Sequence, residues 1–91
     1  MENQAQEVLA LMENVVEDTG VPRNIRKAVE DAKKKVEKGL EATGLSMAIY
    51  LLDDISNDIN MPSHTRTEIW DIISKLEAIK EMVKKWLRAT R

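Results

Sequence analysis

The residues in this sequence that could do chemistry include two acidic pairs at helical spacing. Glu13 lies four residues before Glu17, and Asp54 lies four residues before Asp58, so each pair would share a helix face. Such carboxylates could hold a divalent cation that activates water. Helical nucleotide hydrolases combine several Glu-x-x-Glu and Glu-x-x-Asp sets, whereas only residues 68–71 match here. A metal-dependent hydrolase is therefore the weakest of three functional alternatives.

The sole histidine, His64, comes two residues after Pro62, and the sequence contains no cysteine. A single imidazole at the start of a helix suits a turn or a surface contact better than a metal ligand or a catalytic base. The sequence also lacks the Glu-x-x-His motif of di-iron bundles, a glycine-rich phosphate loop and a catalytic triad. We therefore predict no enzyme activity, no catalytic residue, no metal and no cofactor.

Basic residues form two clusters, at Lys33, Lys34, Lys35 and Lys38 and at Lys80, Lys84, Lys85, Arg88 and Arg91. On one shared face they could follow a phosphate backbone, so a nucleic-acid-associated accessory protein is the second alternative. Two Trp, one Tyr and no Phe leave few side chains to stack on bases. The segments 1–22, 23–38, 39–62 and 63–91 carry net charges of −5, +4, −4 and +3. This alternation predicts attraction between neighbouring antiparallel segments.

Apolar residues at three- and four-residue spacing predict four amphipathic helices that would position these groups. The expected helices span about residues 3–18, 45–58 and 63–88, together with a second helix that has Pro22 in its first turn and ends near residue 38. The third is the most apolar and should be covered on two sides, so Leu51→Asp is expected to unfold the protein.

Glycine and proline mark the expected helix ends. Pro22 and Pro62 should each lie in the first turn of a helix, where a missing amide hydrogen costs nothing. Gly39 and Gly44 should bracket the connection before the third helix. Thr43 or Ser46 would cap the N-terminus of that helix.

The two halves of the sequence also resemble each other. Residues 11–37 align with residues 51–77, and the identical pairs include Asp18/Asp58, Pro22/Pro62 and Arg26/Arg66. We interpret these six residues as fixing two equivalent turns. The predicted fold is all-α, an antiparallel four-helix bundle made of two similar helical hairpins, at about 3–38 and 45–88, within a single domain of residues 1–91. A HEAT-like stack of the two hairpins is the other arrangement considered.

No segment predicts contact with a membrane. The longest apolar run, Met47 to Leu52, is too short to cross a bilayer. A targeting leader carries basic residues near its start, whereas here no basic residue precedes Arg23. Together with the absence of cysteine, this predicts a cytoplasmic protein.

The last helix is expected to be the longest, at roughly 39 Å against roughly 21 to 26 Å for the others. Its final turns must overhang while remaining apolar, which predicts an interface. The interface candidates are Met47, Tyr50, Val83, Trp86 and Leu87. The preferred function is a non-catalytic protein-interaction or structural module, expected as a homodimer, with an unidentified protein as a further partner.

Two stretches, VPRNIR and NMPSHTRTEIW, carry a resemblance to a known family. They resemble uncharacterised protein family 0147, a group of small all-helical archaeal proteins. The resemblance implies a helical bundle in an archaeal cytosol and brings no active site. The segment from about Glu81 to Arg91 looks longer than the usual end of the family.

Overall fold

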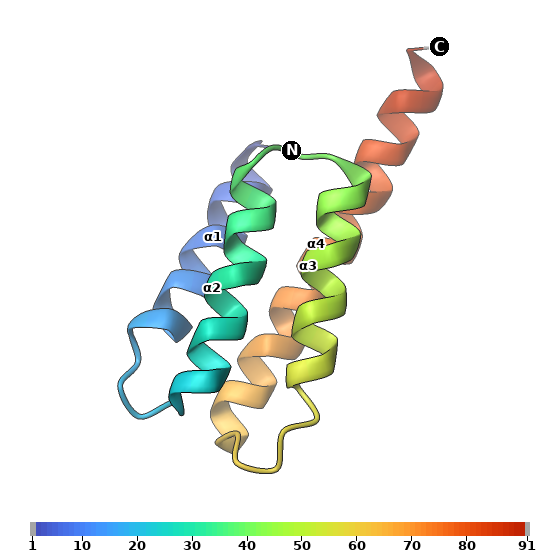
Figure 1. Cartoon of the computed structure of the whole chain (residues 1–91). Helices are drawn as coiled ribbons and strands as arrows, with labels where there is room; N and C mark the ends of the chain where they lie inside the picture. Colours follow the sequence, from blue (N-terminus) through green and yellow to red (C-terminus); the bar gives the residue numbers. More distant parts are fainter. Residues whose placement is uncertain (1, 91) are drawn as a thin grey trace.

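The computed structural model describes residues 2–90, and over that range the protein is helical with no strand. The helices are α1 (Glu2–Glu17), α2 (Arg23–Glu37), α3 (Ala42–Ile55) and α4 (Ser63–Ala89). Figure 1 shows the chain reversing direction at each connection, and α4 extending well beyond the other three helices. No helix within this range is both long enough and apolar enough to cross a membrane.

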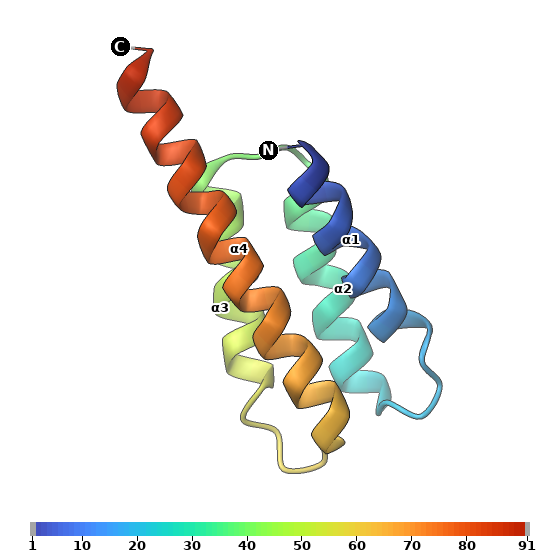
Figure 2. The same ribbon diagram turned by 180° about the vertical axis from the view of Figure 1, so that it is seen from behind.

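The four helices form a ring of neighbours (Figures 1 and 2). α1 packs against α2 and α4, and α3 packs against the same two helices. Within residues 2–90 no backbone packing joins α1 to α3, or α2 to α4. The two basic helices therefore stand at opposite corners of the ring, each between two acidic helices.

The interior is filled by one apolar stripe from each helix, as the helical spacing predicts. The side chains that are fully buried include Val8, Met12, Ile25, Val29, Leu45, Leu52, Ile69, Ile72, Leu76 and Ile79. Leu51 was expected to be buried so deeply that its substitution by aspartate would unfold the protein. Its side chain is only partly buried, because the neighbouring Leu52 occupies the core position.

Both prolines stand immediately before a helix, as N-cap residues of α2 and α4. The carbonyl oxygen of Pro22 accepts a hydrogen bond from the Arg26 amide at 3.1 Å, and Pro62 accepts one from Arg66 at 3.0 Å. Neither proline interrupts a helix. The prolines were expected within the first turn of these helices, and they lie immediately before it, where a missing amide hydrogen also costs nothing.

The expected bounds of the third helix were wrong by one turn at its start. α3 begins at Ala42, its N-cap is Glu41, and neither Thr43 nor Ser46 caps it. Gly44 lies in the first turn of α3, which packs closely on α2. A Cβ atom at this position would lie only 3.2 Å from the Lys35 carbonyl oxygen, so glycine permits the close approach. The connection is consequently shorter than expected, and Gly39 adopts a φ of 140° in it.

The expected end of the third helix was also wrong, since α3 stops at Ile55 rather than near Asp58. The hydroxyl of Ser56 donates a hydrogen bond to the Asp53 carbonyl oxygen at 2.6 Å. The Ser56 carbonyl oxygen accepts a bond from Arg66 Nε at 3.1 Å, so the side chain of an α4 residue satisfies this free carbonyl group.

The two helix–helix turns use their aspartates alike. Asp18 Oδ1 accepts the Gly20 amide at 2.9 Å, and Asp58 Oδ1 accepts the Asn60 amide at 2.8 Å. Each pair spans two residues, which is the geometry of an Asx turn. The aspartates of both predicted turns thus have the same local role.

The arginines of these turns bind backbone carbonyl groups rather than the aspartate carboxylates. Arg26 Nε donates to Val21 O at 2.9 Å, and Arg66 Nη2 donates to Asp58 O at 2.8 Å. Both arginines therefore hold the turn before their own helix, although they reach it through different atoms.

Candidate functional site

The acidic residues within the described range, 2–90, form contacts between helices and turns. Among residues 2–90 no three His, Asp or Glu side chains are placed to share a metal ion. Glu13, from one of the two acidic pairs, instead accepts a hydrogen bond from Lys33 on α2. This hydrogen bond lowers the pKa of Glu13 and raises the pKa of Lys33. The pair joins α1 to α2, which is an architectural role.

His64 lies on the surface and contacts the turn between α1 and α2. Its Nε2 atom is 3.6 Å from Asp18 Oδ2. At the aligned position 24, Asn24 Nδ2 donates to Asp58 Oδ2 at 2.9 Å. Asp18 therefore contacts the first turn of α4, and Asp58 contacts the first turn of α2. This reciprocal contact gives His64 a structural role.

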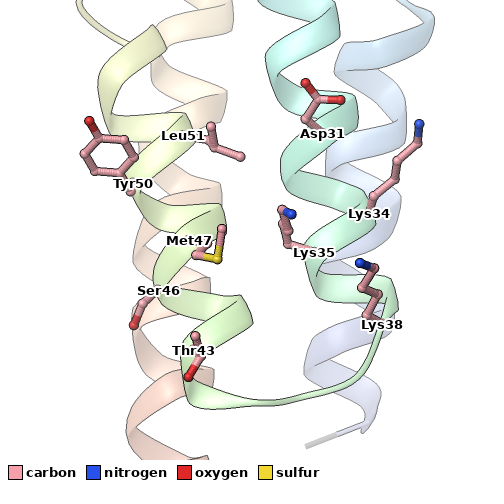
Figure 3. Close-up of a pocket in the computed structure, with 9 residues that line it drawn as sticks. All are labelled: Asp31, Lys34, Lys35, Lys38, Thr43, Ser46, Met47, Tyr50 and Leu51. Atoms are coloured by element: carbon pink, nitrogen blue, oxygen red, sulfur yellow. The ribbon is translucent and has the colours of Figure 1, made fainter.

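A hollow of about 660 Å³ lies between α2 and α3. We call it the α2/α3 groove. The residues that line it include Asp31, Lys35, Lys38, Met47 and Leu51. Figure 3 shows Met47 and Leu51 projecting from α3 toward α2, with Lys35 and Lys38 across from them. The groove thus combines an apolar wall with a basic one.

Tyr50 and Lys34 also border the groove, from its outer sides. Tyr50 projects from α3 away from α2 and leaves 71% of its surface exposed. Lys34 lies on the far side of α2, where its Nζ is 3.7 Å from Glu30. Neither side chain closes the groove.

A second hollow, of about 490 Å³, lies where α4 passes the connection between α2 and α3. We call it the α4 cleft; Leu40, Val83, Trp86 and Leu87 contribute to its walls. Val83 is 4% exposed and belongs to the core, whereas Trp86 and Leu87 are 55% and 47% exposed. From residue 84 to residue 90 every side chain is exposed. Arg91, one of the predicted basic residues, lies outside the described range.

The five interface candidates from the sequence therefore fall in three places. Met47 and Tyr50 belong to the α2/α3 groove, Trp86 and Leu87 belong to the α4 cleft, and Val83 is interior. The sequence interpretation missed two exposed apolar side chains, Ile59 and Trp70, which are 91% and 57% exposed. They occupy the turn before α4 and the second turn of α4.

A family model described as uncharacterised protein family UPF0147 matches residues 1–79. The chain belongs to the UPF0147 family. The UPF0147 protein of Methanocaldococcus jannaschii is 51% identical over 75 residues, which cover 80% of this chain and 81% of the relative. That of Thermoplasma volcanium is 44% identical over 80 residues, covering 86% and 90%. The resemblance found in the sequence is confirmed.

Two crystal structures resemble the fold of this UPF0147 chain. One is of a UPF0147 protein from Thermoplasma acidophilum, with a TM-score of 0.80, 38% identity, and coverage of 86% of this chain and 94% of that one. The other is of an unknown-function protein, MMP1188, with a TM-score of 0.79, 45% identity, and coverage of 84% and 89%. These relatives establish the family and assign no activity to it.

The boundary of the UPF0147 match divides the two hollows. The α2/α3 groove is built from residues 31–51 and lies inside the matched range, which ends at residue 79. Trp86 and Leu87 of the α4 cleft lie beyond it. Properties of the groove can therefore be sought in other UPF0147 proteins, while the α4 cleft must be tested in this chain.

Proposed function

We propose that this UPF0147 protein is a non-catalytic protein-interaction module that forms a homodimer through the end of α4. The observation that carries the proposal is the exposure of Trp86 and Leu87 on a helix end that has left the core. Val83 is the last residue of α4 with a buried side chain, and α4 continues to Ala89. A helix end of this kind gains stability when a partner covers its apolar residues.

The two exposed side chains would supply a large part of the free energy of a reversible dimer. Covering a large apolar side chain that is half exposed contributes about 1 kcal/mol, so Trp86 and Leu87 from two copies would contribute about 4 kcal/mol in total. A micromolar dissociation constant corresponds to about 8 kcal/mol, so these residues would form the centre of a larger interface. A twofold pairing also lets each copy place its exposed tryptophan in the same environment. Tryptophan is among the residues most often found at the energetic centre of interfaces.

The distribution of charge supports protein interaction over binding of nucleic acid. A contiguous basic face would require α2 and α4 to be neighbours, but the acidic helices α1 and α3 separate them. Lys33 and Lys75 also reach across to acidic residues of α1. Any binding of nucleic acid should consequently be weak, independent of sequence and steeply reduced by salt.

We further propose that the ring of helices is an antiparallel bundle of two equivalent hairpins, and that the protein acts in the cytoplasm. The equivalent Asx turns at Asp18 and Asp58 support the first statement. Buried positions also recur at the offset of the repeat, as in Met12/Leu52 and Val29/Ile69. The absence of cysteine supports the cytoplasmic location, because proteins in a reducing compartment rarely contain disulfides.

Sedimentation equilibrium at micromolar concentration tests the dimer. The wild-type chain should be dimeric, and Trp86→Ala should make it predominantly monomeric. Trp70→Ala is the matched control, because Trp70 lies on the same helix and is 57% exposed against 55% for Trp86. A monomeric wild type would refute the proposed dimer, and equal effects of the two substitutions would remove the interface from the end of α4.

A further inference from the structure

The repeat within this chain supplies an internal comparison for the α2/α3 groove. The alignment of residues 11–37 with residues 51–77 makes α4 the counterpart of α2, and α1 the counterpart of α3. The groove between α4 and α1 is therefore the counterpart of the α2/α3 groove. It measures about 170 Å³, against about 660 Å³.

An ion pair accounts for the small size of the α1/α4 groove. Lys75 Nζ lies 3.4 Å from Glu7 Oε1 and 3.5 Å from Asp71 Oδ1. Asp71 and Glu7 together raise the pKa of Lys75. The lysine and both carboxylates thus satisfy one another across the groove, and an external ligand finds no unpaired charge there.

The same lysine is retained in the α2/α3 groove, but neither of its two ion pairs is. Lys35 stands where Lys75 stands, while Met47 replaces Glu7. Asp31, the counterpart of Asp71, is bound instead to Lys27, with 2.7 Å between Nζ and Oδ1. Among residues 2–90 neither Lys35 nor Lys38 forms an ion pair.

The replacement of Glu7 by Met47 also changes the chemistry of the wall. Met47 is 46% exposed and Leu51 is partly buried, so the groove offers an apolar strip beside two unpaired ammonium groups. The aliphatic stems of the lysines extend that strip. From Thr43 to Leu51 the groove follows α3 for about 12 Å, or roughly two helical turns.

We propose that the α2/α3 groove binds an acidic amphipathic helix of a partner protein. The partner would place carboxylates on Lys35 and Lys38, and an aliphatic side chain against Met47 and Leu51. This is the recognition mode in which one helix lies with its apolar side in a hydrophobic groove. The inference rests on the proposed function only in taking the chain to be an interaction module, and it uses a different surface from the dimer.

The end of α4 from a second copy is a poor occupant for this groove. It carries Lys84, Lys85 and Arg88, which would face the lysines of the groove. An extended nucleic acid is also disfavoured, because the exposed Glu41 and Asp53 stand just before and just after residues 43–51, the part of the chain that forms the α3 wall of the groove, and would repel phosphates. A short acidic helix needs only the length of the groove.

Fluorescence anisotropy with a labelled peptide tests the proposal in the full-length protein. The probe is a short helical peptide of leucine, alanine and glutamate, with its leucines on one face. One control peptide replaces glutamate by glutamine, and another replaces leucine by serine. Binding should require both residue types, and the glutamate-dependent part should decrease with added salt.

Three protein variants, Met47→Glu, Lys35→Ala and Lys75→Ala, each lower the net charge by a single unit. Met47→Glu places a carboxylate beside Lys35, as Glu7 lies beside Lys75, and it removes the apolar wall of the groove. This variant should therefore bind the peptide at least about tenfold more weakly. Lys35→Ala should weaken peptide binding about three- to fivefold. Lys75→Ala should leave binding unchanged, and thermal unfolding should show that all three variants are folded.

Several results would overturn the proposal. They are the absence of peptide binding to the wild type, wild-type affinity in Met47→Glu, and an equal loss in Lys75→Ala and Lys35→Ala. Tighter binding of a single-stranded oligonucleotide, lost in Lys35→Ala, would assign the groove to nucleic acid. The dimer is tested separately, because Met47→Glu should still dimerise and Trp86→Ala should still bind the peptide.

Discussion

Truncation of Leu52 in α3 is expected to destabilise the protein far more than truncation of its neighbour Leu51. Leu52 is 0% exposed and lies in the core, whereas Leu51 is partly buried at the edge of the α2/α3 groove. Buried leucine-to-alanine substitutions cost about 2 to 5 kcal/mol, including the cavity they leave. We expect about 3 kcal/mol for Leu52→Ala and about 1 kcal/mol for Leu51→Ala.

Those values are large against the total stability of a folded domain, because native proteins are typically stable by only about 10 kcal/mol. One kcal/mol shifts the melting temperature by about 4 to 8 °C, so Leu52→Ala should lower it by about 12 to 24 °C. Circular dichroism during heating measures the shift, and urea unfolding gives the free energy independently. Equal effects of the two substitutions, or a larger effect at Leu51, would refute the assignment of Leu52 to the core.

Two further predictions concern polar contacts. Glu13→Gln should reduce stability near neutral pH, and this reduction should shrink as the pH falls below 4.5, because a carboxyl group whose pKa is lowered on folding stabilises the protein above its unfolded pKa of 4.5 and loses that contribution as the pH falls through its folded pKa; urea midpoints of both proteins across the acidic range test the sign. Asp18→Ala and Asp58→Ala should each cost about 1 kcal/mol in a background of Asn24→Ala and His64→Ala, which removes the contacts of these aspartates with the other turn and leaves one Asx-turn hydrogen bond for each to lose; a difference of more than about twofold in urea unfolding would show that the turns are not energetically equivalent.

The helical stripes and the two prolines could be predicted from the sequence because local rules decide them. Periodic apolar residues identified Val29 and Ile69 as interior, and proline can occupy only the start of a helix at low cost. The start of α3 followed a different rule. Gly44 is a poor helix former next to plausible caps, but its missing Cβ lets the first turn of α3 approach the Lys35 carbonyl oxygen. Such a close approach depends on the packing of one helix against another, which the helix propensities of single residues do not predict.

The candidate site illustrates the same limit at the level of charge. Lys35 and Lys75 are identical residues at aligned positions of the two halves of the sequence, and each lies four residues after an aspartate. One difference lies on their own helices, because Lys27 pairs with Asp31 whereas Thr67 stands at the corresponding place before Asp71. The other difference lies on the neighbouring helix, where Glu7 faces Lys75 and Met47 accompanies Lys35. Asp31/Asp71 and Lys35/Lys75 keep their charges between α2 and α4, whereas Glu7 of α1 aligns with the uncharged Met47 of α3. One groove is consequently neutralised within the chain, and the other retains the basic and apolar surface on which we propose that a partner helix binds.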